Sequence, residues 1–155
     1  MHWDGIRPVY NRADFIEALA AKIQSNRTPG AHLVMSFHGI PVKSIQKGSP
    51  YEKQCRETAQ SIAAKLQLKD GDYSIAYQSR FGNDHWLQPY LTGHVESLVH
   101  QGVRSIDVVC LSFSVECLEN LEEIGIELTN HLLSCGGEHC NLLHVLTMYA
   151  ITLHF

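Results

Sequence analysis

The sequence has no apolar run that approaches the roughly 20 residues a helix needs to cross a bilayer. Its first residues, MHWDGIRPVY, do not have the form of a secretory signal peptide. Lysine and arginine number 12 against 16 aspartate and glutamate residues, so no basic excess favours a nucleic-acid partner. We therefore expect a cytoplasmic protein with no transmembrane segment and no nucleic-acid ligand.

The cysteine content argues against a disulfide framework. The five cysteines are an odd number, and no CxxC pair occurs, which is typical of reduced thiols in a cytosolic protein. Cys135 and Cys140 have four residues between them and could bind a metal, although this spacing alone is a weak signal. Ten histidines in 155 residues strengthen the expectation of metal binding without locating a site.

The size and composition are those of one globular domain covering residues 1–155, with 45% hydrophobic and 18% charged residues. The spacing of apolar residues and turn signals predicts helices over 11–24, 51–66, 91–101 and 116–133, and strands over 32–37, 73–78, 106–113 and 142–146. Strands that alternate with helices predict a parallel sheet. Because the strands are almost continuously apolar, we expect a Rossmann-like, four-stranded α/β fold with helices on both faces.

The carboxyl ends of parallel strands lie on one edge of a sheet, where α/β proteins bind ligands. In residues 34–41, VMSFHGIP, a buried strand leads directly to His38. Residues 79–86 and 113–119 also follow strand ends. The sequence therefore predicts that these three segments gather at one ligand-binding edge.

An acidic row marks the last predicted helix. Glu116, Glu119, Glu123 and Glu127 are spaced by three, four and four residues, which places them along one helix face. Such a row is usually the solvated face of an amphipathic helix. No lysine or arginine interrupts this one, and it begins at the predicted edge, so it also suits the delivery of a cation or proton. Both interpretations stay open from the pattern alone.

Three other side chains at this edge allow two interpretations. His38 is either a hydrogen-bonded structural residue or a group that accepts a proton or binds a transition metal. Trp86 and Phe113 are either core residues or part of a wall for a ligand. Together with His38 and Glu119 they would suit a flat apolar ligand with a polar centre.

Four stretches resemble the carboxyl-terminal half of ferrochelatase, a family of chelatases. They are SFHGIP (36–41), KGSPYEKQCRETA (47–59), YQSRFGNDHWLQPY (77–90) and CLENLEEIGIE (117–127). They occur in the order and at the spacing of the family, and the resemblance covers about residues 31–137. It implies a chelatase-like fold and a lyase that inserts Fe²⁺, its substrate metal, into protoporphyrin IX in haem biosynthesis.

The resemblance also implies roles for individual residues. His38 resembles the active-site histidine that binds metal or takes a pyrrole proton, and Glu119 resembles the carboxylate across the porphyrin from it. Glu123 and Glu127 resemble an acidic path that leads metal to the site. Trp86 and Phe113 resemble residues that line the porphyrin pocket.

The chain departs from the family pattern in three ways. It resembles one of the two domains between which porphyrin is held, so we expect as partner a missing amino-terminal half or, as in the small single-domain cobaltochelatases, a second copy. A non-catalytic fragment that binds metal or porphyrin, or a degenerate remnant, is the alternative. The end of the sequence, with Thr147 near the position of a family asparagine, lacks the family's last helix. It also lacks the cysteine cluster of members with a [2Fe–2S] cluster, so we expect no such cluster.

Overall fold

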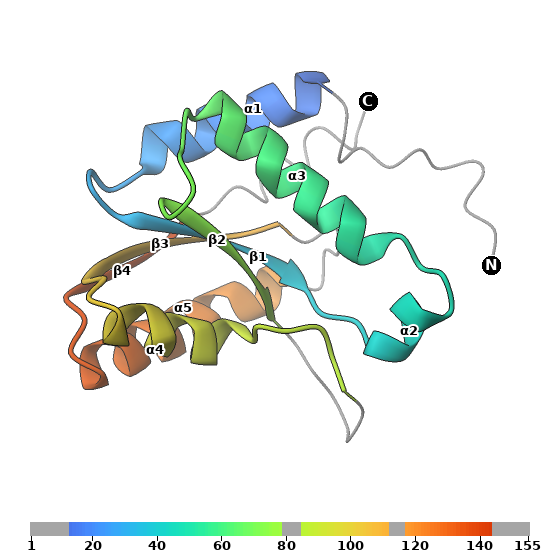
Figure 1. The fold of residues 1–155 in the computed structure, drawn as a ribbon. Coiled ribbons are helices and arrows are strands. Elements are labelled where there is room, and N and C mark those ends of the chain that lie inside the picture. Colours follow the sequence, from blue (N-terminus) through green and yellow to red (C-terminus); the bar gives the residue numbers. More distant parts are fainter. Residues whose placement is uncertain (1–12, 79–84, 112–116, 144–155) are drawn as a thin grey trace.

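The computed structural model describes residues 13–78, 85–111 and 117–143, which form alternating helices and strands (Figure 1). The elements are α1 (Ala13–Asn26), β1 (His32–His38), α2 (Val42–Gln46), α3 (Tyr51–Lys65), β2 (Tyr73–Gln78), α4 (Leu91–His100), β3 (Ser105–Cys110), α5 (Cys117–Ser134) and β4 (His139–Leu143). In these ranges, no helix is both long enough and apolar enough to span a membrane.

The four strands form one parallel sheet in the order β2-β1-β3-β4. Helices α1 and α3 cover one face of the sheet, and α4 and α5 cover the other (Figure 1). The predicted α/β fold class is therefore confirmed. Both faces of the sheet are covered, which explains why the central strands are almost continuously apolar.

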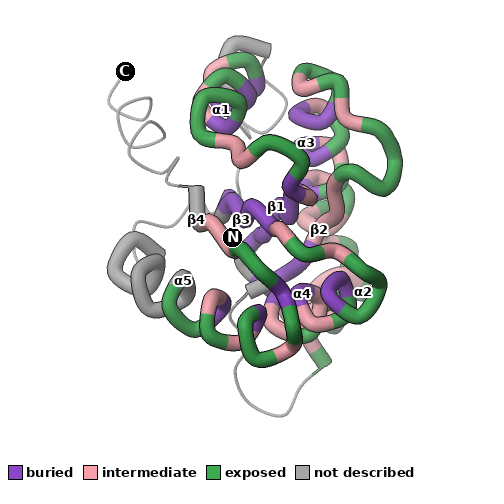
Figure 2. Tube along the Cα trace, turned by 90° about the vertical axis from the view of Figure 1, so that its left-hand side faces the viewer, coloured by how far each residue is buried: buried purple, intermediate pink, exposed green. Residues whose placement is uncertain are grey.

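Each face of the sheet has its own hydrophobic core (Figure 2). Beneath α1 and α3, the predicted apolar face of the first helix is buried at Ile16, Leu19 and Ile23. Beneath α4 and α5, the core includes Leu128 and Leu132 of α5. The apolar residues on one side of each helix therefore form its contact surface with the sheet.

Most predicted boundaries lie within two residues of the observed ones, and three larger differences remain. The segment 39–50, expected to be a loop, contains the short helix α2. Strand β3 ends at Cys110 rather than at residue 113. Leu111 is buried and its N–H still donates to the carbonyl of Ser36 on β1 at 2.7 Å, whereas residues 112 and 113 lie outside the described residues. Strand β4 begins at His139, three residues earlier than predicted. Its first residues include polar ones, so the apolar pattern did not indicate a strand there, although their backbone pairs with β3.

Helix α5 ends on a pair of glycines. Gly136 has a φ of +97°, a conformation that glycine adopts without the strain other residues meet. The next residue, Gly137, is buried, and its N–H donates to the carbonyl of Leu132 at 2.8 Å. A Cβ at Gly137 would lie 2.5 Å from Cγ of Leu132, itself fully buried. The turn therefore depends on the absence of a side chain at this position.

Asp107 is a fully buried carboxylate on β3. Its Oδ2 accepts a hydrogen bond from the backbone N–H of Thr28 at 2.8 Å and lies 3.6 Å from Nε of Arg27. These contacts hold the turn between α1 and β1 against β3, one of the two central strands of the sheet. A cationic side chain and a hydrogen-bond donor therefore face this buried carboxyl group, as a buried polar group requires.

Candidate functional site

The carboxyl ends of the central strands meet at one edge of the sheet, as predicted. His38 is the last residue of β1 and is paired in register with Gln78, the last residue of β2. Ser36 is paired with Cys110, the last residue of β3. His38 is therefore held by strand pairing rather than released into a loop.

The strand order places this edge at a topological switch point. From β1 the chain continues through α3 on one face of the sheet, whereas from β3 it continues through α5 on the opposite face (Figure 1). The two connections diverge between the adjacent strands β1 and β3. Crevices of this kind are where open α/β sheets bind their ligands.

Backbone pairing brings Trp86 to the same edge. The N–H of Val42 donates to the carbonyl of His85 at 2.8 Å, and the N–H of Leu87 donates to the carbonyl of Ile40 at 3.0 Å. These bonds join the segment around Trp86, a half-buried residue, to the loop that follows His38. The aromatic ring thus comes from a chain segment nearly 50 residues beyond the histidine.

Helix α5 starts close to this edge. It begins at Cys117, seven residues after the end of β3, so Glu119 lies in its first turn. Glu123 and Glu127 follow on the same helix, and Glu127 is exposed. The structure gives the backbone positions of His38, Glu119 and Glu123 but not their side chains, and Phe113 and Glu116 lie outside the described residues. The predicted roles of these residues stay predictions.

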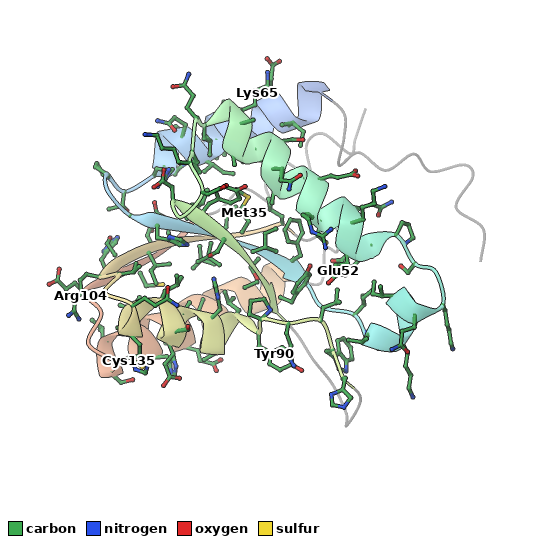
Figure 3. The ribbon with its side chains drawn as sticks, in the orientation of Figure 1. Met35, Glu52, Lys65, Tyr90, Arg104 and Cys135 are labelled. Carbon is green, nitrogen blue, oxygen red and sulfur yellow. The ribbon has the colours of Figure 1, made fainter. Side chains whose placement is uncertain are left out.

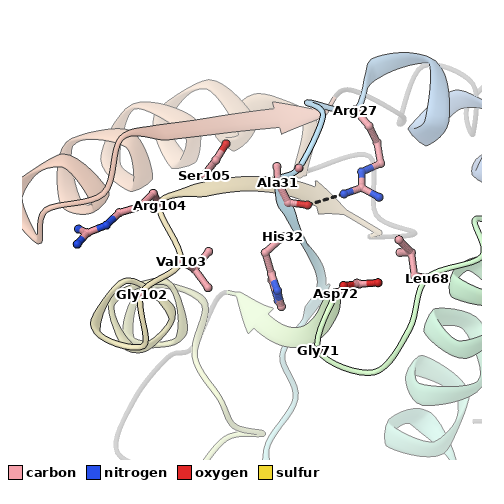
Figure 4. Close-up of a pocket in the computed structure, with 11 residues that line it drawn as sticks. Arg27, Ala31, His32, Leu68, Gly71, Asp72, Gly102, Val103, Arg104 and Ser105 are labelled. Atoms are coloured by element: carbon pink, nitrogen blue, oxygen red, sulfur yellow. Dashed lines mark hydrogen bonds between the residues drawn. The ribbon is translucent and has the colours of Figure 1, made fainter.

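A hollow of about 590 Å³ lies at the opposite edge of the sheet, where the strands begin (Figure 4). Arg27, His32, Asp72 and Arg104 contribute side chains of both charge signs to its lining. Arg27 also donates a hydrogen bond to the carbonyl of Ala31, drawn as a dashed line in Figure 4. Its mixed charge favours no particular ionic ligand, and its position separates it from the edge that carries His38.

One histidine of this hollow belongs to a hydrogen-bonded chain across the sheet. Oγ of Ser74 lies 2.8 Å from Nε2 of His32 and 2.6 Å from Nε2 of His94 on α4. The carbonyl of Gly71 also bonds His32, which leaves its Nε2 free to accept the Ser74 hydroxyl proton. Burial lowers the pKa of both histidines, and the repulsion that two protonated rings would exert on each other lowers the pKa of His94 further. Both rings are therefore neutral in the native chain at neutral pH.

This pair predicts a loss of stability in mild acid. Because the pKa of each histidine is lowered from 6.5 on folding, the unfolded chain binds more protons once the pH falls below that value. The stabilisation is fully present above about pH 6.5 and is lost as the pH falls towards the lowered pKa values. Urea unfolding between pH 8 and pH 5 should show this fall, and His94→Gln should flatten it.

The control for that experiment is His100→Gln, which alters an exposed histidine on the same helix. It should leave the slope of unfolding free energy against pH as it is in the parent chain. Parallel pH profiles for the parent and His94→Gln would contradict a role for the buried pair.

Three cysteines have side chains that the structure describes, and they fall into two kinds. Burial raises the pKa of Cys55 to about 12 and also raises the pKa of Cys140, whose thiol bonds Thr129, so both favour the protonated thiol. Cys135 instead lies beside His131 on α5 and Glu96 on α4. The sequence pattern indicated only Cys140 as a second ligand beside Cys135. The four-residue spacing between His131 and Cys135 could have indicated that these two residues are neighbours on one helix face. No sequence pattern could have indicated that Glu96, on another helix, lies beside them.

Comparisons with known proteins give one consistent family. The family model described as ferrochelatase matches residues 1–150. Ferrochelatase of Methylococcus capsulatus is 46% identical over 134 residues, which cover 84% of this chain and 41% of that protein. Ferrochelatase 1 of Shewanella oneidensis is 44% identical over 127 residues, which cover 80% of this chain and 38% of that protein. The chain thus spans about two fifths of the length of these relatives.

Proposed function

Because the chain belongs to the ferrochelatase family, we propose that it carries the carboxyl-terminal half of a site that inserts Fe²⁺ into protoporphyrin IX. The reaction would serve haem biosynthesis, and we place it in the cytoplasm. The observation that carries the proposal is the strand order, which puts His38 and the start of α5 on either side of the switch point. Trp86 is joined by backbone hydrogen bonds to the same edge.

His38 and Glu119 would carry out the proton and metal chemistry. Protoporphyrin loses two pyrrole N–H protons as Fe²⁺ enters the ring. A neutral imidazole at His38 would accept a pyrrole proton or bind the entering metal. An ionised carboxylate at Glu119 would attract the cation or accept the other proton. Glu123 and Glu127, at successive four-residue steps along α5, would hold the metal on its way to the ring.

The aromatic residues would hold the macrocycle. Trp86 and Phe113 would offer flat apolar surfaces to the porphyrin, and a walled cleft can impose a bent conformation that exposes the ring nitrogen lone pairs. Fe²⁺ is the only metal this proposal needs, and it is a substrate. We propose no [2Fe–2S] cluster in the reaction.

The second wall of the cleft would come from residues outside the segment described by this sequence. Because the chain spans about two fifths of its relatives, we propose that an amino-terminal half or a second copy of the chain completes the site. The same observation favours a second candidate function, in which the chain alone binds metal or porphyrin without inserting one into the other.

An anaerobic insertion assay distinguishes these functions. The chain is mixed with Fe²⁺ and protoporphyrin IX, alone and with a separately produced amino-terminal portion of the Methylococcus capsulatus relative, and porphyrin absorbance is followed. Turnover in either mixture supports the proposal, and size-exclusion chromatography then shows whether a dimer or a hetero-complex is active. Porphyrin binding without turnover in both mixtures identifies a binding module, and the absence of binding rejects both functions.

A further inference from the structure

The interface between α4 and α5 brings together three side chains with metal-binding atoms. His131 on α5 and Glu96 on α4 approach within 3.3 Å, measured from Nε2 to Oε2. Sγ of Cys135 lies 3.9 Å from the same Nε2. One ligand atom from each residue lies within 4.8 Å of the other two. Figure 3 shows Cys135 beside the helical layer formed by α4 and α5.

We propose that Glu96, His131 and Cys135 form a binding site for a divalent transition metal of the Zn²⁺ type. One nitrogen, one sulfur and one oxygen ligand are a set that Zn²⁺ and its neighbours in the first transition row accept, whereas Mg²⁺ and Ca²⁺ prefer oxygen alone. With a thiolate, a carboxylate and a neutral imidazole, the ligands carry two negative charges that balance the ion. A water molecule would take the fourth position.

The distances already suit such an ion. Metal–ligand bonds of about 2.0–2.3 Å in a tetrahedron place neighbouring ligand atoms about 3.3–3.8 Å apart. The separations of 3.3 Å and 3.9 Å at His131 match this range closely, so binding needs only a small adjustment of side chains. The side chain of His131 is 30% exposed and that of Glu96 is 43% exposed, so an ion and its water can reach the site from solvent.

The helix backbone holds two of the ligands in register. His131 and Cys135 are four residues apart, which makes them neighbours on one side of α5. The N–H of Cys135 still donates to the carbonyl of His131, at 3.1 Å, so the helical turn continues through the cysteine although α5 ends at Ser134. Glu96 is fixed on α4, which packs beside α5 on the same face of the sheet.

This site is separate from the proposed porphyrin centre. His131 follows Glu119 by 12 residues, which corresponds to about 18 Å along the helix axis. One ion cannot bridge that distance. His131 and Cys135 nevertheless continue the four-residue spacing of Glu119, Glu123 and Glu127 along the same ridge of α5. The site does not depend on any residue of the porphyrin centre, so it stands even if the chain inserts no metal.

Cobalt spectroscopy tests the site, because thiolate-bound Co²⁺ shows a charge-transfer band that nitrogen and oxygen ligands do not give. The full chain is reduced with a phosphine, kept anaerobic and titrated with Co²⁺, and Zn²⁺ is then added to displace it. We expect a thiolate band that saturates at one equivalent and disappears with Zn²⁺. The band should be absent in Cys135→Ser, and Glu96→Gln should weaken affinity at least about 10-fold.

Matched variants separate this site from the others. Cys140→Ser and Cys117→Ser remove other cysteines, and His38→Ala removes the proposed porphyrin-site ligand, so all three should keep the band. Circular dichroism confirms that each variant is folded, and His131→Asn provides a second loss of ligation if Cys135→Ser does not fold. The absence of any thiolate band in the parent chain, or a band that survives in folded Cys135→Ser or His131→Asn, would overturn the proposal.

Discussion

The His38→Ala variant is expected to lower kcat/KM for metal insertion at least about 100-fold, measured in whichever assembly is active with the parent chain. The expectation rests on the proposed role of the imidazole as proton acceptor or metal ligand, and positioned acid–base groups typically contribute about 10²- to 10⁴-fold. His38 ends β1 at the edge of the sheet. Truncating it to alanine leaves the backbone pairing with β2 intact, so the fold should persist.

His100→Ala is the matched control, since it removes an exposed histidine at the end of α4. It should keep parental turnover. Glu119→Gln should reduce kcat while porphyrin binding, followed by fluorescence quenching, stays close to the parent value. Turnover by His38→Ala within a few fold of the parent would exclude the proposed role of this histidine, provided that circular dichroism shows the variant to be folded.

The Gly137→Ala variant is expected to lower the free energy of unfolding by about 1–3 kcal/mol, the usual range for overpacking a tight core. The added methyl group would meet Cγ of Leu132 at 2.5 Å and its carbonyl oxygen at 3.1 Å. Leu132 is fully buried and cannot move aside without disturbing the packing between α5 and the sheet. Urea denaturation at pH 8 measures the change.

The Gly93→Ala variant is expected to raise the free energy of unfolding in the same assay, which is the opposite effect. Gly93 is an exposed residue of α4, and an added Cβ meets nothing within 4 Å. Because alanine has a higher helix propensity than glycine, this variant should gain up to about 1 kcal/mol. Equal effects of the two substitutions would show that the contact with Leu132 does not limit the packing at Gly137.

The sequence predicted the sheet well because apolar strands and amphipathic helices leave strong periodic signals. Strand β2 was predicted with its exact bounds, Tyr73–Gln78, and His38 was placed correctly at a strand end. Gly102 lies just after the predicted helix 91–101 and has a φ of +101° there, as a glycine that ends a helix commonly does. Each of these features is set by local sequence, either the apolar run of a buried strand or the conformational freedom of glycine.

Features that depend on tertiary contacts were not predictable in the same way. The segment around Trp86 reaches the loop after His38 through backbone hydrogen bonds, which carry no sequence signature. The grouping of Glu96 with His131 depends on which helices pack side by side, and the burial of Asp107 depends on the turn at Arg27 and Thr28. These contacts between distant helices, turns and loops follow from the strand order, which neither the periodicity of apolar residues nor the spacing of residues determines.

The strand order β2-β1-β3-β4 also affects how the chain is made. A ribosome releases β1 before its second neighbour, β3, which emerges roughly 70 residues later and thus after about 4 to 14 s of further synthesis. During that interval β1 can pair with β2 alone and presents a bare, apolar edge to other chains. Nascent chains of this protein should therefore depend on chaperones until β3 has left the exit tunnel, and crowded expression should favour aggregation over folding.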